Sequence, residues 1–357
     1  MLPATQLRPL LCRSPLYPDE SLSSYLHRLA IGNSYVPLSL LTNLIHRRLA
    51  RAGIKDNLRS PMRPQTYDVL SELTCASAQE LAAASIHRLA QAPLLALMEQ
   101  DQVHLSNGQP ILLLNHSVKY RALRRDERAQ FCPHCLREAA YHQLSWFPWE
   151  STVCLKHQCL LVDTCPCSQG GVSIREIVQC RCSRCGVDLA NIATDDISDD
   201  ALALFAQRTI QLWWGMNVPP KPWDGWGLPA EPVPILHQLF TRLTRSVTIV
   251  WEWEHVYGLT TIQPNIHATQ KTAFGALVNW PQGFWTFLQT HLQREKALYR
   301  CNGLVHPDNS SIVRQLLDLS ESPCFHFVGD AVSQFLVANG FKIHSPYTRS
   351  RVYWTSR

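Results

Sequence analysis

Cys132-Pro-His-Cys135 opens a stretch of 54 residues that continues through Cys154-Leu-Lys-His157 and closes with Cys180-Arg-Cys182-Ser-Arg-Cys185. With Cys159, Cys165 and Cys167, it holds nine of the thirteen cysteines of the chain. Clustered cysteines in a reducing compartment indicate metal ligands before disulfides. We therefore expect two structural zinc ions here, with two mainly helical parts on either side.

The first predicted site combines two ligand pairs of the same spacing. Zinc is held tetrahedrally by thiolates and imidazoles, and a gap of two residues lets both members of a pair reach one ion. Cys132 and Cys135 have this gap, and Cys154 and His157 repeat it after eighteen further residues. These four residues supply a complete Cys3His set.

The second predicted site is less regular. Cys182 and Cys185 are two residues apart, but the nearest other pair, Cys165 and Cys167, is separated by a single residue. We expect the second ion to be held by Cys165, Cys167, Cys182 and Cys185, with Cys180 as an alternative to Cys167 or Cys165. Cys159 is instead expected to be buried as a small hydrophobic side chain.

Four protein ligands at each ion indicate structural sites. A catalytic zinc keeps one position open for water, and a fully coordinated ion activates none. The chain also contains no P-loop, no G-x-S-x-G and no H-E-x-x-H motif. We therefore expect no catalytic residues, and a zinc hydrolase or nuclease is the least favoured function.

The composition indicates a folded protein with basic ends. The hydrophobic share of 46% and the charged share of 17% argue against disorder. The net charge of +5 does not by itself indicate nucleic-acid binding. Residues 1–63 carry nine Arg or Lys against three Asp or Glu, however, and no acid follows Asp330. With no signal-peptide pattern and no run of 18 apolar residues, we expect a cytoplasmic protein without a membrane partner.

Two helices with an apolar face are predicted near the N-terminus, the first from Leu22 to about Ala30 and the second after Pro37. A short helix ending near Leu73, a tight turn and a helix from Ser77 to Leu89 follow, and Ser77-x-x-Glu80 is a capping box. This outline fits a helix-turn-helix whose second helix enters a DNA groove, and it fits a plain helical hairpin equally well.

Further helices are predicted in the C-terminal part. The first starts at Ser198-Asp-Asp200. The second covers 235–257, with a short strand at VTIVWEW as an option. Three more are expected over 280–298, over about 311–318, and from an Asp330 cap to Asn339. The tail FKIHSPYTRSRVYWTSR resembles the hairpin of a winged helix-turn-helix, which makes Arg349 and Arg351 candidate nucleic-acid contacts. A strand packed by its aromatic side chains is the alternative.

The predicted fold class is therefore mainly α with small zinc-ribbon β elements. We expect an N-terminal helical helix-turn-helix domain over 1–125, tandem zinc-binding ribbons over 126–195, and a helical C-terminal domain over 196–357.

Three segments resemble the TniQ/TnsD family of transposition proteins. Glu20-Ser-Leu-Ser-Ser-Tyr-Leu-His-Arg-Leu-Ala30 is similar to the first helix of the family, with Tyr25 in place of the usual tryptophan. Leu73-Thr-Cys-Ala-Ser-Ala-Gln-Glu-Leu81 resembles its helix-turn-helix segment. The third segment resembles the zinc-ribbon core of the family. It contains Cys132-Pro-His-Cys135, Trp146, Thr152-Val-Cys154-Leu-Lys-His157 and Leu160-Leu161. Cys165-Pro-Cys167 departs from the C-P-x-C-G pattern of the family, which leaves the ligands of the second site open.

This resemblance implies a bacterial target-site selector that does no chemistry itself. Such proteins mark an insertion site and recruit the AAA+ ATPase regulator that brings the transposase. Some bind a DNA attachment site directly, and others form a homodimer docked on a CRISPR RNA-guided Cascade complex. The length of the C-terminal half fits the second type better. A stand-alone zinc-containing transcription regulator remains the alternative.

Overall fold

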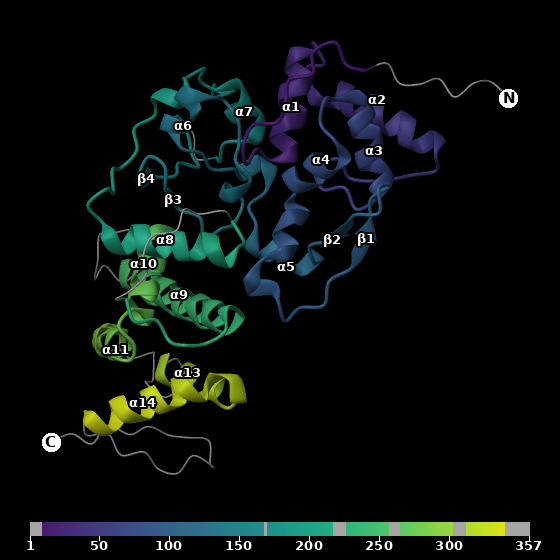
Figure 1. Ribbon diagram of the computed structural model, residues 1–357. Coiled ribbons are helices and arrows are strands. Elements are labelled where there is room, and N and C mark those ends of the chain that lie inside the picture. Colours follow the sequence, from purple (N-terminus) through teal and green to yellow (C-terminus); the bar gives the residue numbers. More distant parts are fainter. Residues whose placement is uncertain (1–8, 168–169, 217–225, 257–264, 303–311, 340–357) are drawn as a thin grey trace. The chain divides into compact units, whose positions relative to one another are not determined.

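The computed structural model describes residues 9–167, 170–216, 226–256, 265–302 and 312–339 (Figure 1). The chain divides into two compact units, residues 1–218 and residues 219–357. The three-domain division made from the sequence stays a prediction. None of the described helices is both long enough and apolar enough to cross a bilayer.

The first unit is mainly helical with two small antiparallel sheets. Strand β1 (Gln102–His104) pairs with β2 (Pro110–Leu112), and β3 (Val153–Cys154) pairs with β4 (Cys159–Leu160). Its helices are α1 (Leu22–Gly32), α2 (Leu38–Arg51), α3 (Pro64–Leu73), α4 (Ala78–Ala84), α5 (His116–Ala122), α6 (Pro133–Glu138), α7 (Ile174–Gln179) and α8 (Ala201–Trp213). Helices, two-stranded sheets and two central cysteine-rich clusters confirm the predicted fold class.

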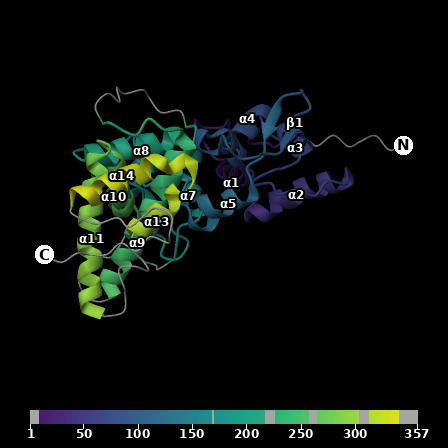
Figure 2. The ribbon, with the colours of Figure 1, turned by 90° about the horizontal axis from the view of Figure 1, so that it is seen from below.

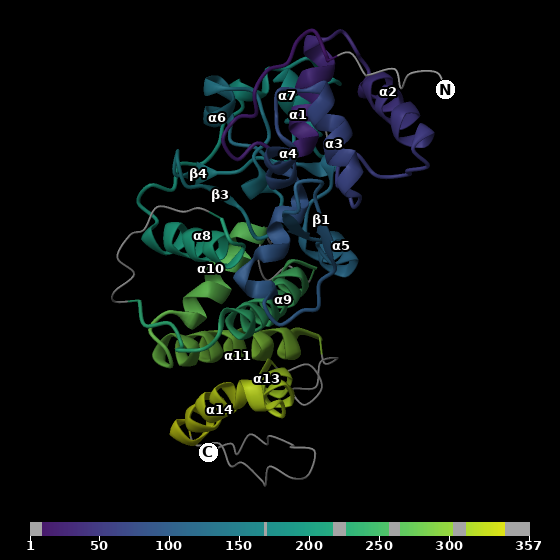
Figure 3. The same ribbon diagram turned by 45° about the vertical axis from the view of Figure 1, so that its right-hand side comes forward.

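The N-terminal core forms where α1 to α4 turn their apolar faces inward. Helix α1 buries its predicted apolar face and also Ser23, Ser24 and His27, whereas α2 buries only Leu41, Ile45 and Leu49. Helix α2 packs against α1 and α3, and Figure 3 shows the three helices side by side. Leu105 and Ile111 of the β1–β2 hairpin belong to the same core.

Helices α3 and α4 form the predicted pair joined by a tight turn. Ser77 caps α4, and both hydrogen bonds of the capping box are present. The Ser77 hydroxyl accepts from Glu80 N–H, and the Glu80 carboxylate accepts from Ser77 N–H. The helix ends at Ala84, short of the predicted Leu89, because the hydroxyl of Ser85 accepts from His87 N–H and starts a separate 3₁₀ turn. The exposed positions of α4 are Gln79, Glu80 and Ala83, so this helix offers no cation to a DNA backbone.

The second unit consists of helices in its described residues. They are α9 (Val233–Val256), α10 (Ile266–Leu277), α11 (Gln282–Asn302), α13 (Ile312–Ser320) and α14 (His326–Ala338). Helices α9, α10 and α11 pack against one another, and α13 packs against α14 (Figure 2).

Two boundaries in the second unit differ from the sequence prediction. The VTIVWEW segment is the end of α9 and not a strand, because Leu243, Val247 and Val250 continue its buried helical face. Helix α14 begins at His326, so Asp330 lies inside the helix and does not cap it. Helix α10 was not predicted.

Candidate metal centres

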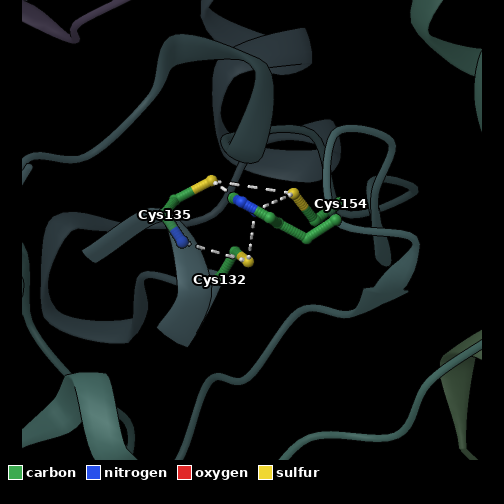
Figure 4. Close-up of side chains that lie close together, drawn as sticks. Cys132, Cys135 and Cys154 are labelled. Atoms are coloured by element: carbon green, nitrogen blue, oxygen red, sulfur yellow. Dashed lines mark hydrogen bonds between the residues drawn. The ribbon is translucent and has the colours of Figure 1, made fainter. Parts of the chain in front are cut away.

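The first cluster brings together the four predicted donors Cys132, Cys135, Cys154 and His157. Cys132 caps α6 and Cys135 lies in its first turn, where its N–H donates to the sulfur of Cys132 (Figure 4). Cys154 ends β3, and His157 lies in the turn that leads to β4. The three thiols are buried, and only the imidazole is partly exposed.

The distances within this cluster fit a tetrahedral zinc ion. Zinc–sulfur bonds of about 2.3 Å and zinc–nitrogen bonds of about 2.0 Å place two sulfurs about 3.8 Å apart and a sulfur and a nitrogen about 3.5 Å apart. The Sγ atoms of Cys135 and Cys154 are 3.7 Å apart. His157 Nδ1 lies 3.4, 3.3 and 3.6 Å from the sulfurs of Cys132, Cys135 and Cys154. A disulfide needs about 2.05 Å, so these spacings match a shared ion and not a cross-link.

Glu138 orients the imidazole of His157. Its Oε1 lies 3.2 Å from His157 Nε2, and Lys156 donates to its other oxygen. The hydrogen bond from Lys156 lowers the pKa of the Glu138 carboxyl, which keeps it an anion that accepts from Nε2–H. The proton is thus held on Nε2 and Nδ1 is left as the donor atom, which is the usual arrangement around a metal-bound histidine.

Cys159 lies beside this cluster. It is buried, as expected, but its sulfur lies 3.5 Å from that of Cys132, so it is not packed among hydrocarbon alone. Its S–H is placed to donate to the Cys132 thiolate. This contact could not be predicted from the sequence, since Cys159 belongs to no pair of cysteines or histidines with a two-residue gap.

The second cluster brings together Cys165, Cys167, Cys182 and Cys185. The sulfurs of Cys165 and Cys185 are 3.7 Å apart, and those of Cys167 and Cys182 are also 3.7 Å apart. These spacings again match the sulfur–sulfur edge of a tetrahedral zinc site, about 3.8 Å. Cys167 and Cys185 are exposed, so this cluster lies nearer the surface than the first.

Cys180 lies outside both clusters. It ends α7 in a left-handed conformation, with a φ of 51°, and its thiol donates to Asp188. The structure therefore gathers Cys167 and not Cys180 into the second donor set, which was the alternative left open by the sequence.

Glu176 of α7 positions the turn between Cys182 and Cys185 in the second cluster. Its Oε1 accepts from the N–H and the hydroxyl of Ser183, and its Oε2 accepts from Ser173 in a capping box. Burial opposes the charged form, but these hydrogen bonds outweigh it and lower the pKa of Glu176 to about 2. The Ser173-x-x-Glu176 pattern is a visible capping signal that the sequence reading missed.

The segment that follows Cys132, Cys135 and α6 is hydrogen-bonded to the start of α1. His142 N–H donates to Ser24 Oγ, and its Nδ1 lies 3.1 Å from Ser21 Oγ. Asp19 accepts from Leu144 N–H through its carbonyl and from Ser145 N–H through its carboxylate. The first cluster and the N-terminal helices are therefore parts of one packed structure.

The motif at the start of α1 is an internal ion pair. The Glu20 carboxylate is fully buried and accepts from Ser24 Oγ and from Nε and Nη2 of Arg28, with the closest contact at 2.7 Å. All three residues belong to the Glu20–Ala30 segment, and their contacts are structural.

The predicted nucleic-acid contacts, Arg349 and Arg351, lie outside the described residues.

Both clusters can hold a metal ion with four protein donors each. Zinc with such a set supplies folding free energy and offers no position for substrate or water. The arrangement thus suits a structural role.

Comparison with known proteins gives one family. No curated protein matches the chain. The TniQ family model matches residues 11–161, a range that contains α1 to α4 and the whole first cluster but ends before the second. Residues 11–161 are thus a TniQ family domain, which marks the chain as a transposition-associated protein.

Proposed function

We propose that the protein is a non-catalytic target-site selector of a bacterial transposon. It links a target-recognition module, either a CRISPR Cascade complex or a DNA attachment site, to an AAA+ transposition regulator and through it to the transposase. It carries two structural zinc ions and acts as a homodimer in the cytoplasm.

The observation that carries this proposal is the TniQ domain over residues 11–161. Its buried Glu20–Arg28 pair and the contacts between α1 and His142 join the N-terminal helices to the first cluster in one packed structure. A scaffold without an open metal position suits a protein that positions other proteins and leaves the chemistry to them.

A stand-alone transcription regulator is the second candidate. It needs an element that reads bases, and α4 exposes Gln79, Glu80 and Ala83 without a cation. Base reading relies mainly on Arg, Lys, Asn and Gln at the start of a recognition helix. Helix α4 meets this need at Gln79 alone, which favours the adaptor.

Affinity purification of the tagged full chain from its native host tests the proposal. We expect an AAA+ ATPase to be recovered with it, and a Cascade complex as well if the target is reached through guide RNA. Recovery of RNA polymerase subunits without any ATPase would overturn the adaptor and support the regulator. Cys154→Ser is the control, because loss of the first zinc should abolish the specific partners.

A further inference from the structure

Helix α2 presents one face that packs against nothing in the described first unit. Its buried residues, Leu41, Ile45 and Leu49, fall on one side and contact α1 and α3. The opposite side consists of the exposed residues Ser39, Leu40, Asn43, His46, Arg47, Ala50 and Arg51. Helical spacing places these on a single stripe along the helix.

The exposed face and the loop after it are basic. No Asp or Glu occurs between Glu20 and Asp56. Arg47 and Arg51 are four residues apart, which places them on adjacent turns, about 6 Å apart along the axis. Lys55 and Arg63 continue the exposed cations into the following loop. Within the described residues, no ion pair engages any of these four side chains.

Two carboxylates next to this surface, Asp56 and Glu72, make their contacts within the described residues with other groups and not with these four cationic side chains. Asp56 accepts from the N–H groups of Met62 and Arg63 and from the hydroxyl of Thr66, so both of its oxygens hold the loop together. Glu72 of α3 lies 3.8 Å from Arg48, which leaves the other arginines of α2 facing solvent.

A stabilising effect on the helix end explains only part of this pattern. Cations in the last turn, here Arg48 and Arg51, interact favourably with the helix dipole. Arg47 lies one turn earlier on the same face as Arg51, at the i,i+4 spacing where like charges destabilise a helix by about a few tenths of a kcal/mol. Lys55 and Arg63 lie outside the helix altogether.

We propose that this surface, Arg47, Arg51, Lys55 and Arg63, binds the phosphate backbone of duplex DNA. Phosphate contacts require positive charge without a fixed spacing and position a protein on DNA without reading its sequence. A single strand would favour stacking on aromatic side chains, and the exposed face of α2 has none apart from His46. The surface therefore holds DNA through α2 and the loop that follows it, and it positions the protein on DNA without reading the sequence.

This inference deepens the proposed function, which includes a DNA attachment site among its targets, and it rests on that function for the choice of DNA as ligand, but it is separate from the recruitment of an ATPase. A protein that recruits no ATPase can still bind DNA through α2, and a transposition adaptor can lack DNA affinity of its own. The two are tested by different measurements.

Fluorescence anisotropy of the zinc-loaded full chain with a mixed-sequence DNA duplex provides the test. The variant is Arg47→Glu with Arg51→Glu, and the matched control is Arg242→Glu with Arg245→Glu, two exposed arginines of α9. Both variants change the net charge equally. Arg47→Gln with Arg51→Gln serves as a milder version, and circular dichroism with zinc content verifies folding.

We expect the α2 variant to weaken binding at least on the order of tenfold, while the α9 variant stays near the parent protein. The slope of log affinity against log salt should become shallower by about 1.8 for two lost phosphate contacts. Equal losses in both variants would show a net-charge effect and overturn the proposal. So would an unchanged salt slope, a preference for single-stranded RNA over the duplex, or loss of a protein partner with DNA affinity intact.

Discussion

At the scale of single residues, the donor sets could be predicted because metal chemistry dictates spacing. Two-residue gaps identified Cys132, Cys135, Cys154 and His157 before any coordinates, and the structure gathers those four. The choice between Cys167 and Cys180 could not be made this way, since each is separated from its neighbouring cysteine, Cys165 or Cys182, by one residue and not by two. It depends on the turn at the end of α7, where the left-handed Cys180 directs its thiol to Asp188.

Replacing Cys154 by Ser should remove the first zinc ion and destabilise the protein. Structural zinc contributes folding free energy directly, so the loss should appear as a lower unfolding midpoint and one ion fewer per chain by metal analysis. Cys180→Ser is the matched control, because its thiol lies outside both clusters. A Cys154→Ser protein that has lost one zinc ion but unfolds at the midpoint of the parent protein would contradict a structural site.

Protonation of His87 should destabilise the fold below about pH 6.5. His87 is buried, its Nδ1 accepts from Leu114 N–H, and burial lowers its pKa to about 4. Between pH 4 and 6.5 the unfolded state then binds more protons than the folded state. The free energy of unfolding therefore decreases by about 1.4 kcal/mol for each unit by which the pH is lowered, as far as this group is concerned.

Urea unfolding of the parent protein and of His87→Asn across this range measures the effect. Asn keeps an acceptor but does not titrate, so its curve should be shallower than that of the parent by that amount. Identical pH slopes would show that another group dominates. Zinc release by acid affects both proteins alike and cancels in the difference.

At the scale of elements, helices were predictable wherever one face is buried. The spacing of Leu22, Leu26 and Leu29 gave α1, and Ser77 with Glu80 gave the start of α4. The end of α9 was open to misassignment because β-branched residues favour strands, yet burial of Val247 and Val250 on the helical face overrides that preference. The buried pair in α1 was invisible, since spacing alone does not tell an internal ion pair from a solvated one.

Removal of the Arg28 side chain should be far more harmful than removal of Arg48. Arg28→Ala leaves the fully buried Glu20 carboxylate without its cation, and breaking such a pair costs about 3–5 kcal/mol. Arg48 faces the half-exposed Glu72 at 3.8 Å, and surface pairs of this kind contribute at most about 1 kcal/mol. Denaturant midpoints of the two variants compare them directly, and similar losses would show that the Glu20 site relaxes and takes up water.

At the scale of the whole molecule, composition and length predicted a folded protein of more than one part, but not where it divides. The contacts of Asp19 and Ser21 with residues 142–145 join segments that are far apart in sequence. No local sequence pattern in either segment predicts that contact. The structure accordingly groups the N-terminal helices and both cysteine clusters within residues 1–218.

Chelation of zinc should therefore loosen the first unit selectively. Hydrogen exchange of the full chain, with and without a strong chelator, should show lost protection in α6, α7 and the start of α1, because α1 is bonded to the segment beside the first cluster. Helices α9 to α11 should keep their protection. Uniform deprotection of both units would contradict this division, and no change at α1 would show that its contacts with residues 142–145 carry little energy.

The bonds between α1 and His142 also set an order of events during synthesis on the ribosome. Ser21 emerges 121 residues before the imidazole that it contacts. At translation rates of about 5–20 residues per second, the first helix waits on the order of ten seconds for that partner. During that interval Arg28, only eight residues away, is the one partner of Glu20 in this ion pair that the ribosome supplies early, and Glu20 becomes buried only when the rest of the domain arrives.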